Sequence, residues 1–177
     1  MKTILAIDCG TVSGWATWAA DEPRPRSGTF RAPPAIDGEF GRTFAAFQEW
    51  LAGMVSMIRP DLICFEAPLV MASGAGPKVR TNHNTGRMLF GFATIVEMVA
   101  FQAGVDVAEV NISTARKHFV GTGRAEKRMV YDRACALGWA PNSADAADAL
   151  AVLDLARATT SPASAAYSTL LFGEVGR

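Results

Sequence analysis

The stretch of sequence that decides the fold reads ILAIDCGTVSGWA and covers residues 4–16. An apolar run ends in one carboxylate, Asp8, and then turns through Gly10 and Gly14 into a second run of strand-forming residues. Because glycine adopts positive φ without steric cost, this pattern predicts a buried strand, a tight turn and an antiparallel partner strand. A charge at the end of a core strand is costly to desolvate, so Asp8 either meets a cation there or caps the turn through its own backbone.

The composition indicates one domain with a sizeable core, because 177 residues suit a single hydrophobic core. The three cysteines lack the spacing of a zinc site or a disulfide framework. No signal-peptide pattern or membrane span is predicted, so we expect a cytoplasmic protein. Seventeen basic and seventeen acidic residues give a formal net charge of zero, which by itself argues weakly against nucleic-acid binding. Residues 74–133, however, hold nine basic and five acidic side chains, so a basic face is expected.

Hydrophobic periodicity along the chain predicts a three-stranded meander followed by alternating helices and strands. Apolar residues recur at three- and four-residue spacing over 38–58, which is typical of a helix with one apolar stripe. Residues 70–85 combine glycine, proline and basic residues, and a loop of this length is usually functional or disordered. The expected strands cover 3–8, 14–19, 28–32, 62–65 and 105–110, and the expected helices cover 38–58, 86–103, a short basic stretch from Ser113, 125–137 and a last helix capped by Ser143.

Four carboxylates stand at the ends of these elements. Asp8 and Glu66 follow two buried strands, and Asp145 and Asp148 share one face of the last helix because they are three residues apart. Each acid alone has a plain structural explanation, as a cap or as half of an ion pair. Together they are expected to meet at one edge of a mixed sheet, where they could not all stay ionised without cations. Hard oxygen ligands suit Mg²⁺ or Mn²⁺, and a pair of such ions is a known device for phosphoryl displacement.

The order of strands and helices is that expected of an α/β, RNase H-like fold with a central five-stranded mixed sheet flanked by helices. The sequence resembles the RuvC-type Holliday junction resolvases of that superfamily in four segments, 4–14, 63–68, 120–127 and 144–150, of which the last is the most diagnostic. The resemblance extends over 3–18, 62–69 and 86–153. It implies an RNase H-like nuclease domain over 1–158, followed by an irregular tail over 159–177, and a phage-type member is one alternative.

The resemblance implies a Mg²⁺- or Mn²⁺-dependent endonuclease, with two metal ions per active site, that cuts opposed strands of a four-way DNA junction during recombination and repair. Asp8 would bridge the two metals, and Glu66, Asp145 and Asp148 would complete their coordination. Lys127 matches a family lysine near the scissile phosphate and would offset charge in the transition state. Cleavage of two opposed strands implies a symmetric homodimer.

Further positions are expected to contact DNA. Lys117 matches a second basic position of the family, and Leu69 occupies a position where the family commonly presents an aromatic that stacks at the junction centre. Contacts that hold DNA phosphates without reading bases are expected from Lys78, Arg80, Arg87, Arg116 and Arg124. The helix over 86–103 is apolar on nearly every side, so a second copy of the chain could cover one of its faces. Gly10 and Gly14 are expected to keep the space above Asp8 clear for metal and DNA.

Three other functions compete with this reading. A branched-DNA nuclease of broader substrate range would need the same acids. An actin-like or sugar-kinase-like ATPase also begins with Asp-x-Gly, a turn and a strand, but it needs a second phosphate loop and an adenosine motif, and neither appears in the 177 residues. A catalytically silent DNA-binding module would keep a basic face but would have no reason to keep four converging acids.

Overall fold

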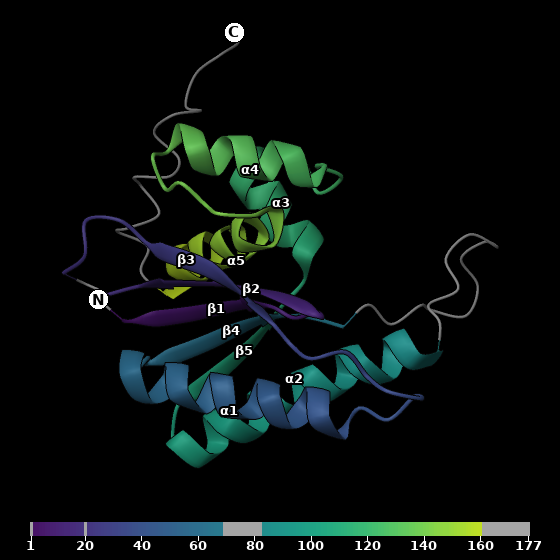
Figure 1. Cartoon of the computed structure of the whole chain (residues 1–177). Coiled ribbons are helices and arrows are strands. Elements are labelled where there is room, and N and C mark those ends of the chain that lie inside the picture. Colours follow the sequence, from purple (N-terminus) through teal and green to yellow (C-terminus); the bar gives the residue numbers. More distant parts are fainter. Residues whose placement is uncertain (1, 20, 69–82, 161–177) are drawn as a thin grey trace, which may run out of the picture.

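The computed structural model describes residues 2–19, 21–68 and 83–160. In this part of the chain, one five-stranded mixed sheet lies between two layers of helices (Figure 1). The strands are β1 (Ile4–Asp8), β2 (Val12–Trp18), β3 (Arg26–Arg31), β4 (Leu62–Glu66) and β5 (Asp106–Val110), and the helices are α1 (Gly41–Ile58), α2 (His83–Ala103), α3 (Ile112–Val120), α4 (Lys127–Ala136) and α5 (Ala144–Thr160). The predicted fold class is therefore confirmed.

The order of strands across the sheet is β3-β2-β1-β4-β5. Neighbours β1 and β2, and β2 and β3, are antiparallel, whereas β4 is parallel to both β1 and β5. The opening stretch thus forms the predicted strand, turn and antiparallel strand, with Asp8 opposite Gly14. Because Ile7 is in register with Phe65, the next residues along the two parallel strands, Asp8 and Glu66, leave the sheet side by side.

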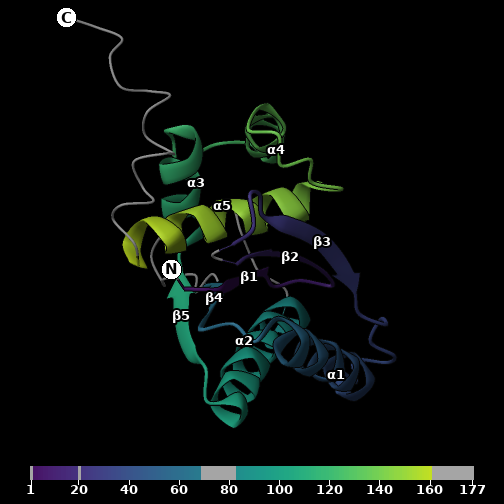
Figure 2. The same ribbon diagram turned by 90° about the vertical axis from the view of Figure 1, so that its left-hand side faces the viewer.

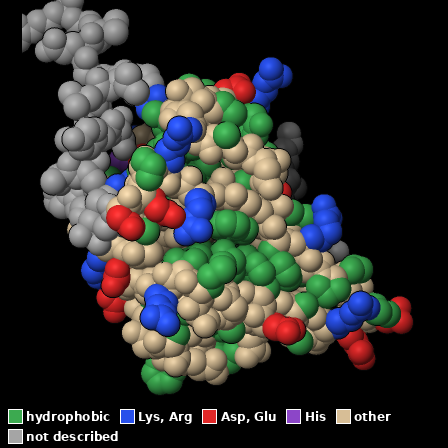
Figure 3. All heavy atoms as spheres, turned by 60° about the vertical axis from the view of Figure 1, so that its left-hand side comes forward, with side chains coloured by type: hydrophobic (Ala, Val, Ile, Leu, Met, Phe, Trp, Pro, Cys, Tyr) green, Lys and Arg blue, Asp and Glu red, His purple; other side chains and the backbone are tan. Residues whose placement is uncertain are grey.

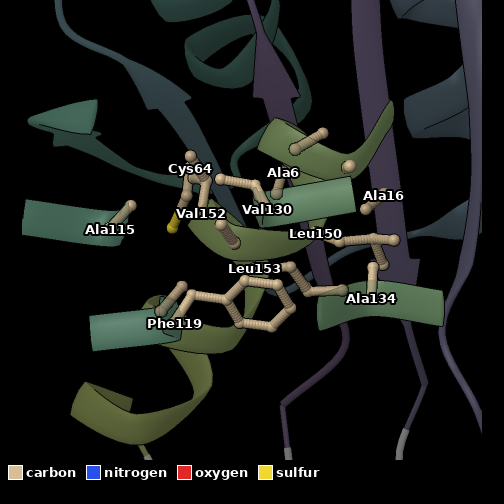
Figure 4. Close-up of a cluster of buried hydrophobic side chains, with 14 of the residues drawn as sticks. Ala6, Ala16, Cys64, Ala115, Phe119, Val130, Ala134, Leu150, Val152 and Leu153 are labelled. Carbon is tan, nitrogen blue, oxygen red and sulfur yellow. The ribbon is translucent and has the colours of Figure 1, made fainter. Parts of the chain in front are cut away.

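Alternating side chains of each central strand enter two separate cores. Ile4 and Ala6 of β1 pack in the core with residues of α3, α4 and α5, whereas Leu5 and Ile7 pack with residues of α1 and α2. These two groups of helices lie on opposite faces of the sheet (Figure 2). The middle of α5 is buried throughout, since the helix lies between the sheet and the outer helices α3 and α4. Its alanines let these neighbours approach closely, while larger side chains fill the remaining space. Figure 4 shows this packing around Leu150, Val152, Leu153, Phe119 and Val130.

The helix ends differ slightly from those expected. Helix α2 begins at His83, three residues before the predicted start, and α5 continues through Thr160, so residues 159 and 160 are helical. Ser143 caps α5 as predicted, because its Oγ accepts a hydrogen bond from the backbone N–H of Ala146 at 3.0 Å. Most of the predicted loop over 70–85 and of the predicted tail lies outside the described residues. Among the described helices, none is long and apolar enough to cross a membrane.

Candidate active site

The two strand-end acids form a pair at one edge of the sheet. Asp8 at the end of β1 is 9% exposed, and its side chain is hydrogen-bonded to that of Glu66 at the end of β4. The parallel pairing of β1 and β4 explains this contact, because it brings the carboxyl ends of both strands together. The predicted convergence of Asp8 and Glu66 therefore follows directly from the register of the sheet.

The other two acids reach the same edge because α5 begins there. Gly14 lies opposite Asp8, and a Cβ atom on Gly14 would sit 1.9 Å from the backbone carbonyl oxygen of Asp145. The missing side chain of Gly14 therefore makes room for the first turn of α5, not for metal and DNA, so the reason predicted for this glycine is wrong. A Cβ on Gly10 would meet the Val12 carbonyl oxygen at 3.2 Å, inside the turn itself.

Two cations of the chain hold the acids of α5. The Arg116 guanidinium donates two hydrogen bonds to Asp148, from Nε to Oδ1 at 3.0 Å and from Nη2 to Oδ2 at 2.8 Å. Lys127 Nζ donates to Asp145 Oδ1 at 2.6 Å and lies 3.7 Å from Asp148 Oδ2. Lys127, predicted to act near the scissile phosphate, thus lies between the two aspartates of α5.

Asp8 and Glu66, the two acids at the strand ends, have more negative than positive charge around them. Burial, the hydrogen bond to Glu66 and the charges of Glu66 and Asp148 raise the pKa of Asp8 to about 9, and the charge of Lys127 offsets this only in part. Among the described residues, no lysine or arginine forms an ion pair with Asp8 or Glu66. Asp8 therefore holds its proton at neutral pH, at the position where a bound cation would relieve the repulsion.

The pKa values of Arg116 and Lys127 are also raised, which for basic groups favours the charged form. The hydrogen bond to Asp148 is the main cause that raises the pKa of Arg116, and the charges of Asp148, Glu66 and Asp8 add to it against the effect of burial. Partial burial alone would lower the pKa of Lys127, but the hydrogen bond to Asp145 and the surrounding carboxylates raise it overall. Both side chains therefore stay charged at neutral pH.

The donor chemistry fits Mg²⁺ or Mn²⁺, since hard cations prefer carboxylate oxygens. Within the described part of the chain, however, no three histidine, cysteine, aspartate or glutamate side chains form a ready metal cage. Asp8 and Glu66 are the acids most readily available to a metal ion. Beside them lies a cavity of about 50 Å³, which is lined by Cys9, Glu66, Ala67, Pro68 and Leu89.

The predicted DNA contacts are placed differently from one another. Lys117 on α3 and Arg124 between α3 and α4 are exposed, and the exposed Arg87 holds its guanidinium 5.3 Å from the centre of the Phe40 ring. Arg116 instead turns inward to Asp148. Acidic and basic side chains are interspersed on the side of the molecule where β1 begins (Figure 3). The remaining predicted contacts, Leu69, Lys78 and Arg80, lie outside the described residues.

The inward direction of Arg116 was not predicted from the sequence, although the spacing of apolar residues in α3 indicates it. Ile112, Ala115 and Phe119 form the stripe of α3 that packs into the core, and Arg116 lies four residues after the first of them and three before the last. Residues at these spacings share a helix face. The periodicity therefore placed Arg116 beside the buried stripe and Lys117 away from it.

Comparisons with known proteins agree with the fold. No family model matches the sequence. The chain is 29% identical over 154 residues to the crossover junction endodeoxyribonuclease RuvC of Zymomonas mobilis, covering 84% of this chain and 86% of that protein.

Three solved structures share the fold. Thermus thermophilus RuvC matches with a TM-score of 0.63 at 20% identity, covering 97% of this chain and 96% of that chain. The same protein in complex with a Holliday junction substrate gives a TM-score of 0.67 at 19% identity, over 86% and 90% of the chains. The yeast mitochondrial Holliday junction resolvase gives 0.56 at 11% identity, over 84% and 75%.

These relatives lend no support to a phage-type member, and the fold match lends none to an actin-like ATPase. The sequence relative and the structural matches point to one group of proteins. By sequence this chain is similar to the RuvC of Zymomonas mobilis, and it shares the fold of the RuvC-type Holliday junction resolvases.

Proposed function

We propose that this protein is a divalent-metal-dependent endonuclease that cuts four-way DNA junctions. The observation that carries the proposal is the pair formed by the buried Asp8 and the partly buried Glu66. Neither acid forms an ion pair with a lysine or arginine of the described residues, and both lie at the sheet edge where α5 brings two further aspartates. The RuvC name of the sequence relative supports the choice of junction DNA as substrate. The same chemistry would serve a role in DNA recombination and repair.

Each acidic residue has its own part in this proposal. Asp8 and Glu66 would hold the first Mg²⁺ ion, and Asp145 and Asp148 would complete a second site on the α5 side of Asp8. When bound, a pair of Mg²⁺ ions supplies the activation of water and the stabilisation of the leaving 3′ oxygen. Asp8 must give up its proton to bind a cation, so binding is expected to release a proton near neutral pH.

Lys127 is proposed to meet the phosphate that is cut. Its side chain is half exposed, at the start of α4, and its ammonium group already lies at the acidic edge. A phosphate bound there could take over the ammonium group from Asp145, and the positive charge would then stabilise the transition state. Lys117 and Arg124 are exposed on the same α3–α4 side of the molecule and are proposed to hold the DNA backbone.

We further propose that the protein acts as a symmetric homodimer. One face of α2 packs on the sheet, but Phe90, Met98 and Phe101 on the helix are exposed, Phe101 to 86%. Val107 on the edge strand β5 is also exposed. Exposed apolar side chains grouped on one element are typical of an association surface. A dimer would present two active sites to the two opposed strands of a junction.

The proposal is tested with a panel of four-way junction, flap, fork and duplex DNAs in Mg²⁺. We expect two symmetric nicks in the junction and little cutting of linear duplex. Asp8→Asn should abolish cutting while junction binding survives, and Asp132→Asn, at an exposed acid of α4, is the matched control that should cut normally. Equal cutting of flaps and forks would favour a nuclease of broader range, and binding without any cutting would favour a silent DNA-binding module.

A further inference from the structure

We propose that Arg116 is a positioning residue that fixes Asp148 at the acidic edge of the sheet, and that it does not contact DNA. The inference rests on the proposed function, because it assigns Asp148 to the metal-binding acids. It replaces the sequence-based expectation that Arg116 contacts a DNA phosphate.

Arg116 uses all three guanidinium nitrogens inside the protein. Nε and Nη2 bond the two carboxylate oxygens of Asp148, and Nη1 donates to the backbone carbonyl of Ala125 at 3.2 Å. The side chains of Arg116 and Asp148 are 19% and 2% exposed. Two parallel bonds from a planar fork fix both the position and the rotation of a carboxylate. An arginine held in this way is not available to a DNA phosphate on the surface.

The surrounding fold is built to hold this contact. The Ala125 carbonyl precedes α4, and Gly123 lets the connection pass close to α3, because a Cβ there would lie 2.9 Å from the Ser113 carbonyl oxygen. Arg116 therefore joins α3, the α3–α4 connection and α5 at one point. Lys127 differs, since its side chain is half exposed and makes one short bond to Asp145. Arg116 is therefore the more enclosed cation of the site, and Lys127 is the more exposed one.

The contact leaves Asp148 able to bind a metal ion. Each carboxylate oxygen has two lone-pair sites, and Arg116 takes one on each oxygen, so one site on each remains. Without Arg116, the buried carboxylate of Asp148 would lose the two hydrogen bonds that fix its position and rotation and would stand uncompensated near Asp8. Outer partners that orient metal ligands commonly change metal affinity by 10- to 100-fold when they are removed, roughly the size expected for Arg116.

The test compares Arg116→Met with Lys117→Met, which removes the neighbouring exposed cation of the same helix. Calorimetric titration with Mn²⁺, without DNA, should show affinity about tenfold or more weaker for Arg116→Met and wild-type affinity for Lys117→Met. Arg116→Lys should not restore the affinity, because a single ammonium group cannot hold both carboxylate oxygens. Unchanged Mn²⁺ affinity in Arg116→Met would overturn the proposal.

Junction binding in EDTA gives the second measurement. Lys117→Met should reduce the slope of log affinity against log salt by about one, as for one lost phosphate contact, whereas Arg116→Met should keep the wild-type slope. A reduced slope in Arg116→Met would make it a DNA contact and overturn the proposal.

A double-mutant cycle keeps the test valid if Arg116→Met folds poorly. In an Asp148→Asn background, which has no buried charge to compensate, Arg116→Met should shift the urea midpoint much less than in the wild type. Equal shifts in both backgrounds would overturn the proposal. The Mn²⁺ and unfolding measurements need no cleavage, so they judge Arg116 separately from the proposed nuclease activity, which fails only if the wild-type protein cuts no junction.

Discussion

Asp8→Asn should remove a specific pH dependence from the stability of the metal-free protein. Burial, the hydrogen bond to Glu66 and the charges of Glu66 and Asp148 raise the pKa of Asp8 from 3.8 to about 9. Between these two values the folded protein holds a proton that the unfolded chain has released. Because the folded state binds more protons, the free energy of unfolding must fall as the pH rises through this window.

The size of this change in the free energy of unfolding follows from the difference of one bound proton between the folded and unfolded states. A difference of one bound proton changes the free energy of unfolding by about 1.4 kcal/mol per pH unit, so Asp8 can account for a loss of up to about 2.7 kcal/mol between pH 6 and pH 8. Asparagine has a similar shape but cannot ionise, so the variant should lack this loss. Relative to the wild type, Asp8→Asn should therefore gain stability as the pH rises.

The assay is urea unfolding in EDTA at pH 6, 7 and 8, followed by tryptophan fluorescence. Asp132→Asn is the control, because Asp132 is an acid on the surface of α4, and it should keep the wild-type dependence on pH. Addition of Mg²⁺ should restore stability to the wild type at pH 8 more than to Asp8→Asn. Parallel pH curves for the wild type and Asp8→Asn would refute the raised pKa of Asp8 in the folded protein.

Three further substitutions test other parts of the molecule. Lys127→Met should slow junction cleavage by about 100-fold in single-turnover assays with junction affinity largely kept, and a loss of affinity alone would reduce Lys127 to a phosphate contact. Phe101→Glu should give a monomer by sedimentation with the fold intact, since Phe101 is exposed, and an unchanged sedimentation coefficient would place the dimer interface elsewhere. Gly14→Ala should cost about 3 kcal/mol of unfolding free energy, because its Cβ would collide with the Asp145 carbonyl, and an unchanged urea midpoint would contradict that packing.

Sequence by itself determined the elements and the positions of the acids. Apolar runs and helical spacing are local properties, so the strands ending at Asp8 and Glu66 and the helix carrying Asp145 and Asp148 could all be predicted. The order of these elements was enough to place Asp8 and Glu66 at one edge, because parallel strands end on the same side of a sheet. Asp145 and Asp148 join them only through the packing of α5 against Gly14.

The tertiary structure alone decided which partners these residues have. Arg116 and Asp148 are 32 residues apart in the chain, and Gly14 touches a helix that begins 130 residues later. Periodicity shows the face on which a residue lies, but a partner is fixed by distances between elements, which arise only when the layers pack. For this reason the sequence suggested a DNA contact at Arg116 and open space at Gly14. In the packed structure, Arg116 forms an ion pair with Asp148, and the backbone of Asp145 fills the space beside Gly14.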